Sequence, residues 1–449
     1  MNRTFIQSNG RGSVRPRILL TDTNRWPLGP RLAMGFASMG GDISVVCPLP
    51  GHPAAKTSVV TRTFPYQPRR PLSSLKRVIR MVDPDLILPL CDRSVQYLHE
   101  LHSAAITDDG PDSKIAKLIE RSLGAPESFQ IVSSRYQLLQ MARSEGIRVP
   151  EMMAIGSVAD LNLWCAKTAP PWVIKADGTW GGRGVRLSRK ANEALQDWQE
   201  LSLRPSLLEL TKRLSLNRDR GWILSDWWNH LRPNILAQSY ISGRPANCAV
   251  VCWQGKLLAG IAVEVVQAQG PTEPAIVVRV VEGAEMLRAA QVLALRLKLS
   301  GFFGLDFMIE ENTELPYLIE MNPRCTPPCP IPLGRGRDLV AALWAQLLNE
   351  PLNERKSVTN KTRITYFPRN GGGNDGAQAI PLDTTYYDLP EGEPQLVEEL
   401  LHPWSARSLL GQILDSARKI ATRDKTSTSY VFEKALEPVD PDTQSVLRR

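Results

Sequence analysis

The stretch GLDFMIEENTELPYLIEMNPR, residues 304–324, contains two apolar runs that flank the polar, turn-like segment EENTE. This pattern predicts a β-hairpin. With the turn centred on Thr313, the facing pairs are expected to be Asp306 with Glu320, Met308 with Leu318, and Glu310 with Pro316. Side chains alternate between the two faces of a strand. The hairpin therefore gathers one polar set on a single face: Asp306, Glu320, Asn322 and Arg324.

Two of these side chains are carboxylates, and carboxylates directly opposite on paired strands repel each other. A divalent cation between Asp306 and Glu320 would remove the repulsion. Oxygen ligands from two acids and the amide of Asn322 suit Mg²⁺, which usually binds substrate phosphates as well. Arg324 could then bind a phosphate or carboxylate through two hydrogen bonds. The alternative is a solvated hairpin face with ordinary surface charges.

Length and composition set broad limits. A chain of 449 residues is too long for one ordinary core, so we expect two or three domains. The 54 basic and 46 acidic residues leave a net charge of +8, and no run of five Lys or Arg occurs. A nucleic-acid surface is not indicated, because an anionic small substrate accounts for the excess equally well.

The chain has the features expected of a cytoplasmic protein without a membrane segment. Its seven cysteines are an odd number scattered along the chain, which does not suit a disulfide framework. The N-terminal residues lack the apolar core of a signal peptide. No apolar stretch approaches the roughly 20 residues of a membrane span.

Residues 17–122 alternate short apolar runs with helical patterns, which predicts a parallel α/β domain after a disordered arm at 1–16. The strands are expected at 18–22, 43–47 and 86–90, and helices at 32–40 and 73–82. The first turn, TDTNRWPLG, lacks the G-x-G-x-x-G spacing. A nicotinamide or flavin site is therefore not predicted.

The middle of the chain carries basic residues and a glycine-rich loop. A helix is expected from Ser133 to Gly146, with Arg135 in its first turn. The strand 172–176 contains Lys175, and four glycines follow in the eight residues 177–184. Glycines let backbone N–H groups wrap a phosphate, although a tight surface turn is the alternative. Further strands are expected at 235–241, 247–253, 256–266 and 276–281, and a helix at 284–299.

After residue 324 the composition changes to the Pro-rich TPPCPIP, and a helix is expected over 338–348. From 351 we expect a separate small unit reaching 424, with a strand at 363–368 and helices near 395–401 and 404–420. Residues 425–449 are expected to form a flexible tail.

These parts, in this order, resemble the ATP-grasp family, and IEMNPR at 319–324 is the most specific piece. The family includes carboxylate–amine ligases, biotin carboxylase and the synthetase domains of carbamoyl phosphate synthetase. The resemblance covers roughly residues 130–345 and implies an ATP-grasp domain at 123–350 with two α+β lobes. The segment 17–122 would be the Rossmann-like α/β domain that usually precedes it, so the fold class is α/β and α+β.

The resemblance also implies roles for individual residues. Lys175 would hold the α- and β-phosphates of ATP, Arg135 would also contact phosphate, and Arg324 would stabilise the transferring phosphoryl group. The metal ligands for one or two Mg²⁺ (or Mn²⁺) would be Asp306, Glu320 and Asn322. The remaining nucleotide contacts would come from the loop glycines Gly178, Gly181, Gly182 and Gly184 and from the hinge residues Gln238, Ser239 and Ile241.

The implied reaction activates a substrate carboxylate as an acyl phosphate and joins it to an amine or similar nucleophile. The alternatives are carbamoyl-phosphate-synthetase-like activation of bicarbonate and a non-catalytic ATP-binding protein. Two departures from the family stand out: Gln238 replaces a usual Glu, and Pro245-Ala246-Asn247 replaces a further Glu or His. Arg279 is a candidate catalytic residue that would bind a substrate anion, and a surface arginine on an edge strand is the alternative.

Three other groups of residues are weighed without a functional role. A zinc site at Cys325 and Cys329 lacks a second Cys/His pair, and a cysteine lining the substrate end of the cleft is preferred. His99 and His102 share a helix face, for which a solvated surface is preferred. A lid or packing role is considered for Trp222, Trp227 and Trp228. The partners expected are small-molecule substrates, with no nucleic acid and no membrane; a homodimer is left open.

Overall fold

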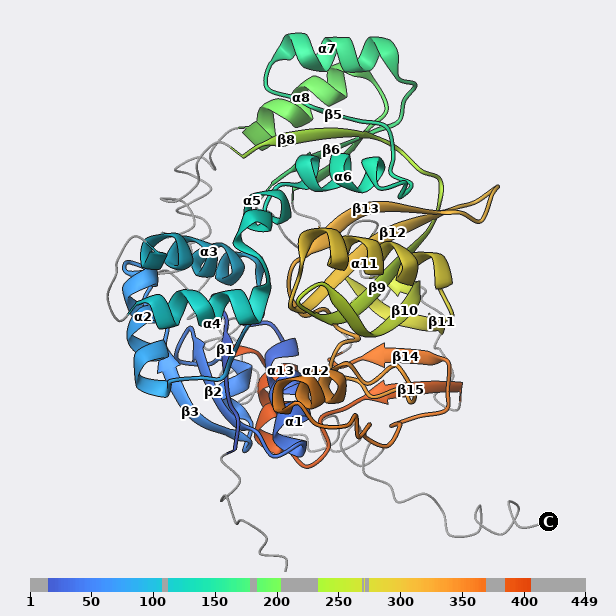
Figure 1. The fold of residues 1–449 in the computed structure, drawn as a ribbon. Coiled ribbons are helices and arrows are strands. Elements are labelled where there is room, and N and C mark those ends of the chain that lie inside the picture. The colour runs from blue at the N-terminus through green and yellow to red at the C-terminus, as the bar shows by residue number, and fades with distance from the viewer. Residues whose placement is uncertain are drawn as a thin grey trace, which may run out of the picture.

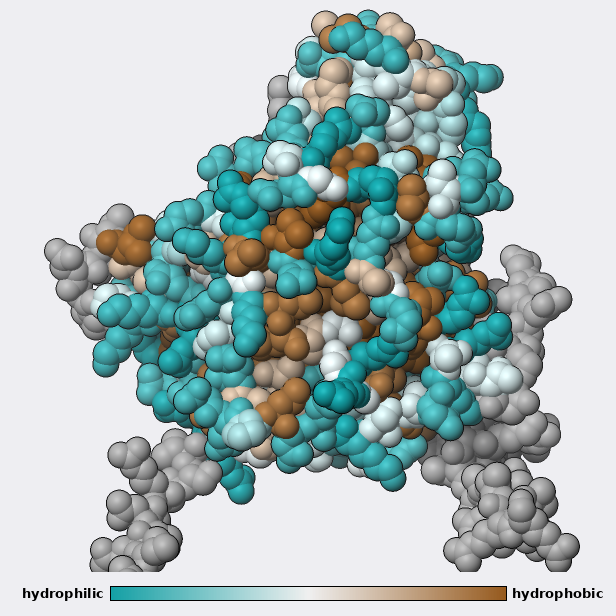
Figure 2. Space-filling model, turned by 45° about the vertical axis from the view of Figure 1, so that its right-hand side comes forward, coloured by the Kyte–Doolittle hydropathy of each residue, from teal (hydrophilic) through white to brown (hydrophobic). Residues whose placement is uncertain are grey.

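The computed structural model describes residues 15–106, 112–177, 184–202, 233–268, 270, 274–368 and 384–404. In this part of the chain there are three sheets, of four, seven and four strands. A lobe that carries α7 (Val158–Lys167) and α8 (Ala191–Ser202) projects from a larger body, at the top of Figures 1 and 2. Among the described residues, no helix combines the length and the apolar character needed to cross a membrane.

The first sheet is parallel, with strand order β3-β2-β1-β4. Its central strands are buried apolar runs, as expected where helices cover both faces. One face packs on α1 and the other on α2, α3 and α4. The order reverses between β1 and β4, where the carboxyl ends of parallel strands form a crevice. The elements are β1 (Arg17–Thr21), α1 (Leu28–Ser38), β2 (Asp42–Cys47), η1 (Pro53–Lys56), β3 (Val60–Pro65), α2 (Pro71–Val82), β4 (Leu86–Pro89), α3 (Asp92–Ile106) and α4 (Ser113–Leu123).

This domain confirms the predicted parallel α/β arrangement, and the strand β3 was not predicted. Its residues are all half-buried or exposed, because the strand lies at the edge of the sheet. They therefore lack the continuous apolar run that marks the central strands.

A short connection leads to the projecting lobe. It contains η2 (Pro126–Ser128), α5 (Phe129–Val132) and α6 (Arg135–Ser144). The side chain of Ser134 accepts a hydrogen bond from the Gln137 N–H and so caps α6. The predicted helix with Arg135 in its first turn is confirmed. The lobe is an antiparallel sheet of order β5-β8-β6-β7 against which α7 and α8 pack. Its strands are β5 (Met152–Ala154), β6 (Trp172–Ala176), β7 (Val185–Ser188) and β8 (Ile235–Ser239).

The large sheet has the order β13-β12-β9-β10-β11-β14-β15. Helix α11 packs against one face, whereas α12 and the N-terminal domain pack against the other. This places the hairpin β12–β13 at the edge of the sheet, beside α6 and below the projecting lobe (Figure 1). The elements are β9 (Gly243–Trp253), β10 (Lys256–Ala268), β11 (Ala275–Val281), α11 (Ala284–Leu297), β12 (Gly301–Glu310), β13 (Pro316–Asn322), α12 (Leu339–Leu348), β14 (Arg363–Tyr366), β15 (Thr385–Asp388) and α13 (Pro394–Leu401).

Of the described residues after 351, those that form strands belong to this sheet and not to a separate one. β14 pairs antiparallel with β11, and β15 extends the sheet beyond it. The predicted helix near 395–401 is α13. Residues 405–420 of the predicted helix, residues 1–14 of the predicted arm at 1–16 and the tail at 425–449 lie outside the described residues, as do Trp222, Trp227 and Trp228.

The hairpin forms as predicted, but its register shifts at one point. Asp306 pairs with Glu320, as expected. Beyond this pair a β-bulge leaves Ile319 as an extra residue, and an extra residue on one strand displaces every later pair. The predicted facing of Met308 with Leu318 and of Glu310 with Pro316 is therefore wrong; the pairs are Phe307 with Leu318, Met308 with Tyr317 and Ile309 with Pro316.

The two histidines on α3 are not a solvated face. His102 is buried and shares a 2.8 Å hydrogen bond with Glu120. His99 stacks on Phe129, with ring centroids 3.9 Å apart. The preferred reading of these residues as solvated surface is wrong, because α4 and α5 cover this side of α3.

Candidate functional site

The paired carboxylates of the hairpin have different environments. Asp306 accepts hydrogen bonds from Asn247 (2.6 Å) and Asn322 (2.8 Å). Burial and the neighbouring Glu320 raise the pKa of the Asp306 carboxyl. Burial also opposes ionisation of Glu320, but the cations of Arg135 and Lys175 outweigh it and lower its pKa. The pKa values of these two neighbouring acids are thus shifted in opposite directions.

Arg135 connects three elements at this point. From the first turn of α6 it donates a 2.7 Å hydrogen bond to Glu320. It also donates to the carbonyl oxygen of Ala176 at the end of β6, and its guanidinium lies 3.7 Å from the Asp177 carboxylate. Arg135 therefore ties the projecting lobe to the edge of the large sheet.

Lys175 is brought to the same place from β6. Its side chain is buried, and its ammonium donates a 3.1 Å hydrogen bond to the carbonyl oxygen of Ile319, the bulged residue of β13. Burial lowers the pKa of Lys175 to about 8; Glu320 opposes this shift and Arg135 adds to it. Perturbed ionisable groups of this kind gather at functional sites more often than elsewhere.

Arg324 lies on the other side of the carboxylate pair. It donates hydrogen bonds to Asp92 (3.0 Å) at the start of α3 and to Asn322 (3.2 Å). Asp92 lies at the carboxyl end of β4, next to the point where the strand order of the first sheet reverses. The N-terminal domain therefore fixes the guanidinium beside the hairpin.

The structure thus brings together six of the predicted site residues with three that were not predicted. The predicted ones are Lys175, Arg135, Asp306, Glu320, Asn322 and Arg324, and the others are Asp92, Asp177 and Asn247. Asn247 lies on β9 directly opposite Asp306. Strand pairing between β9 and β12 would have identified it, but no local pattern specifies that pairing.

The donor set fits a hard divalent cation. Two carboxylates lie on facing strands, two amides flank them, and the oxygen of one amide, Asn247, is buried without a hydrogen-bond partner among the described residues. The described part of the chain contains no cluster of three or more His, Cys, Asp or Glu side chains suited to a metal. A site of two acids completed by amides, water and phosphate oxygens is typical of Mg²⁺.

The glycine loop lies between two paired strands. Lys175 pairs with Val185 across β6 and β7, and Ala176 donates its N–H to the carbonyl oxygen of Gly184 at 2.9 Å. Gly184 therefore stands at the base of the loop. Gly178, Gly181 and Gly182 lie outside the described residues.

The predicted hinge residues lie at the end of β8 and in the connection that follows it. Gln238 is buried, and its amide nitrogen has no partner among the described residues. Ser239 donates its N–H to the carbonyl oxygen of Glu151 at 2.9 Å, so this N–H is already used inside the lobe. Ile241 follows two residues later, in the connection to β9.

Arg279 is not part of the cluster. It pairs across the sheet with Glu264, to which it donates a 2.5 Å hydrogen bond. Its strand neighbour Val280 is in register with Val263, Asn247 and Asp306, so Arg279 points to the opposite face. Arg279 was expected to face the cleft. In the observed register Val280 lies on the face that carries Asp306, and Arg279 lies on the other face.

Two further groups lie away from this site or inside the core. Cys325 and Cys329 are fully buried, so neither lines an open cleft.

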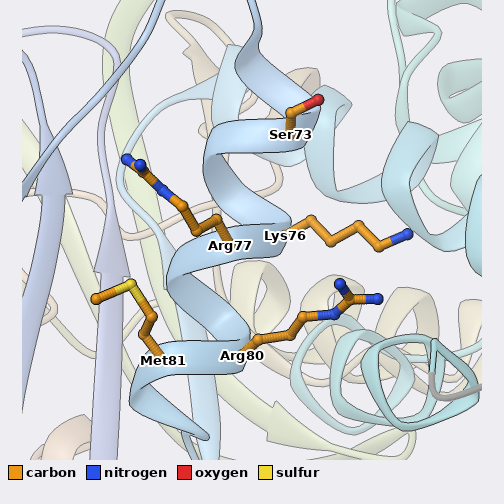
Figure 3. Close-up of a pocket in the computed structure, with 5 residues that line it drawn as sticks. All are labelled: Ser73, Lys76, Arg77, Arg80 and Met81. Carbon is orange, nitrogen blue, oxygen red and sulfur yellow. The ribbon is translucent and has the colours of Figure 1, made fainter.

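A shallow basic depression lies on α2 (Figure 3), lined by Ser73, Lys76, Arg77, Arg80 and Met81. Lys76 and Arg80 both pair with Asp112, which neutralises part of this charge. The depression shares no residue with the cluster around Glu320.

Comparison with known proteins gives one family match. Residues 221–328 match the model of an ATP-grasp domain, a range that contains β8 to β13 and therefore the whole β12–β13 hairpin. No curated protein matches the chain in sequence.

Solved structures of similar fold are numerous, and three illustrate them. The biotin carboxylase domain of Hydrogenobacter thermophilus 2-oxoglutarate carboxylase, solved with MgADP, ADP and bicarbonate, is 15% identical, with a TM-score of 0.53 over 76% of this chain and 71% of that one. The Staphylococcus aureus N5-carboxyaminoimidazole synthetase complexed with ADP is 13% identical, with a TM-score of 0.51 over 76% and 79%. The Campylobacter jejuni biotin carboxylase, a β-γ-ATP complex, is 15% identical, with a TM-score of 0.53 over 77% and 74%.

Proposed function

The chain contains an ATP-grasp domain, and we propose from this premise that it is an ATP- and Mg²⁺-dependent ligase. It would activate a substrate carboxylate as an acyl phosphate and join it to an amine or a similar nucleophile. The single observation that carries the proposal is the convergence of Lys175, from the projecting lobe, and Arg135, from α6, on the paired acids Asp306 and Glu320.

The nucleotide would bind between the lobe and the large sheet. Lys175 and Arg135 would hold its phosphates, and the loop with Gly178, Gly181, Gly182 and Gly184 would cover them. Gln238, Ser239 and Ile241 would meet the adenine at the hinge. The neighbours solved with ADP or ATP support this placement through their shared fold.

Asp306, Glu320 and Asn322 would hold the cation, Mg²⁺ or Mn²⁺. When bound, it would neutralise the negative charge of the triphosphate and keep it in line for transfer. Asp306 is already oriented by two amide donors, which limits the movement needed to receive a cation. Orientation by outer hydrogen bonds of this kind tunes a metal site.

Arg324 would act at the end of the site where the acid binds. A carboxylate oxygen attacks the γ-phosphorus. The bond between the γ-phosphorus and the oxygen that bridges the β- and γ-phosphates breaks, which releases ADP and leaves an acyl phosphate. The nucleophile then attacks the acyl carbon, inorganic phosphate leaves, and the proton lost from the amine passes to phosphate or solvent. The Arg324 guanidinium, fixed by Asp92, would stabilise the charge that moves onto these oxygens.

Bicarbonate is the second candidate for the acid. The Hydrogenobacter thermophilus domain was solved with bicarbonate beside its nucleotides, and its fold is similar to that of this chain. Bicarbonate is small enough to meet a single arginine, and its activated form would be carboxyphosphate. A non-catalytic ATP-binding role is less well supported, because the basic residues and both acids of the cluster are all present.

The test is ADP release with separate panels of carboxylic acids and bicarbonate, each with and without amines. For any acid that supports turnover, a carboxylate labelled with ¹⁸O should transfer one labelled oxygen to inorganic phosphate. Hydroxylamine should trap the activated acid as a hydroxamate. ATP turnover that leaves phosphate unlabelled would contradict the acyl phosphate step.

A further inference from the structure

Asn247 occupies a position that the proposed ligand set does not include. It lies on β9, and the pairing of β9 with β12 puts it directly across from Asp306. Asp306 in turn pairs with Glu320 on β13. The three side chains form one row across three neighbouring strands and lie on the same face of the sheet.

The orientation of the Asn247 amide is set by its neighbours. Its nitrogen donates to the Asp306 carboxylate at 2.6 Å and to the carbonyl oxygen of Leu305 at 3.3 Å. Both partners are acceptors only, so the nitrogen, and not the oxygen, must face them. The amide oxygen is therefore directed away from these two partners.

That oxygen is buried and has no hydrogen-bond partner within the described ranges. A buried oxygen without a hydrogen bond lowers the free energy of unfolding, and in native structures such an oxygen usually binds a water molecule, an ion or a ligand. This oxygen shares its carbon atom with the nitrogen that is bonded to Asp306, so it lies near the Asp306 carboxylate.

Asn322 offers a direct comparison, because its amide also donates to Asp306, at 2.8 Å. Its oxygen, however, accepts a 3.2 Å hydrogen bond from Arg324. Of the two amides that flank Asp306, only Asn247 has an oxygen that no described residue occupies.

We infer that the side-chain oxygen of Asn247 is a further oxygen donor to the divalent cation site. The inference rests on the proposed function, since it concerns the same site. It adds a second amide oxygen to the two carboxylates and the Asn322 amide, a set that suits hard cations such as Mg²⁺ and Mn²⁺. It also gives a role to a position at which the chain departs from the acidic or histidine residue expected in an ATP-grasp protein.

The test measures Mn²⁺ affinity by electron paramagnetic resonance, with a non-hydrolysable ATP analogue bound, so that no turnover is needed. Asn247→Leu keeps the branched shape of the side chain and removes both polar atoms. Asn247→Asp keeps an oxygen in the same place and removes the nitrogen donor. We expect Asn247→Leu to weaken Mn²⁺ binding roughly 10- to 100-fold, whereas Asn247→Asp binds Mn²⁺ at least as tightly as the wild type.

The matched control is Asn312→Ala, at the exposed turn of the same hairpin, where the amide donates a hydrogen bond to Glu310. Its Mn²⁺ affinity should equal that of the wild type, and thermal unfolding should show that each variant is folded. An equal loss in Asn247→Leu and Asn247→Asp would overturn the inference, because it would show that only the nitrogen matters. Unchanged affinity in Asn247→Leu would overturn it as well. Absence of Mn²⁺–nucleotide binding in the wild type would instead remove the proposed function, and the inference with it.

Discussion

Arg324 donates a 3.0 Å hydrogen bond to Asp92, a residue 232 positions earlier in the chain. The contact joins the end of the β12–β13 hairpin to the carboxyl edge of the parallel sheet in the N-terminal domain. The same guanidinium bonds to Asn322 at 3.2 Å. Asp92 of the N-terminal domain therefore helps to orient Arg324, a residue of the proposed phosphoryl-transfer site.

Replacement of Asp92 by Asn tests this placement. The variant keeps a hydrogen-bond acceptor but loses the charge that holds the guanidinium. We expect kcat/KM for ADP release to fall about 10- to 100-fold, since a small misplacement of a catalytic group is enough for such a loss. Nucleotide affinity should change little. The control is Asp83→Asn, which loses an exposed ion pair with Arg17; equal effects in both variants would contradict a specific role for Asp92.

Replacement of Glu320 by Gln or Ala tests the carboxylate pair. The change removes the hydrogen-bond partner of Arg135. It also removes the negative charge of Glu320, which raises the pKa of Lys175 and so counteracts part of the effect of burial. We expect nucleotide turnover to fall by about 100-fold or more, while circular dichroism shows an intact fold. Unchanged turnover would remove Glu320 from the metal assignment.

The pKa of Lys175 predicts a pH dependence of nucleotide binding. Burial lowers this pKa to about 8, so the ammonium is present below pH 8 and is lost above it. If Lys175 binds phosphate, the affinity for an ATP analogue should be highest below this pH and should weaken as the pH rises toward 10. Calorimetric titration across this range measures the effect, and Lys175→Met should bind weakly with little pH dependence. Identical pH profiles for the two proteins would contradict the assignment.

The same shift predicts a trend in stability. Between pH 8 and the ordinary pKa of an unfolded lysine, the unfolded chain binds more protons than the folded one. The free energy of unfolding therefore receives a contribution that rises with pH over this interval. Lys175→Met should lack it, as urea denaturation at several pH values would show.

His99 predicts a sensitivity to acid that is unrelated to the site. Burial, and then the neighbouring His102, lower the pKa of His99 to about 4. The unfolded chain therefore takes up a proton at higher pH than the folded one, and stability should fall as the pH drops from about 6.5 to 4. Gln at position 99 should reduce this dependence in urea denaturation experiments. An unchanged slope would show that stacking on Phe129 does not keep the ring neutral.

The fold and most of the cluster follow from the sequence because they depend on local patterns. The hairpin, the capped helix with Arg135 and the strand with Lys175 each carry a periodicity or a capping residue that marks them. The bulge at Ile319 was not predicted, since both registers keep apolar residues on the buried face near it. Asn247 and Asp92 were missed because their roles arise from strand pairing and domain docking. Arg279 was placed on the wrong face for the same reason.

The most direct test of the central claim is calorimetric binding of a non-hydrolysable ATP analogue, first with Mg²⁺ and then with EDTA. The proposed site predicts tight binding by the wild type with Mg²⁺. Binding should be weaker when the cation is removed, and it should also be weaker in a Glu320→Ala variant with Mg²⁺ present. The absence of binding under both conditions would mean that the glycine loop and the hairpin are structural, and it would contradict the ligase proposal.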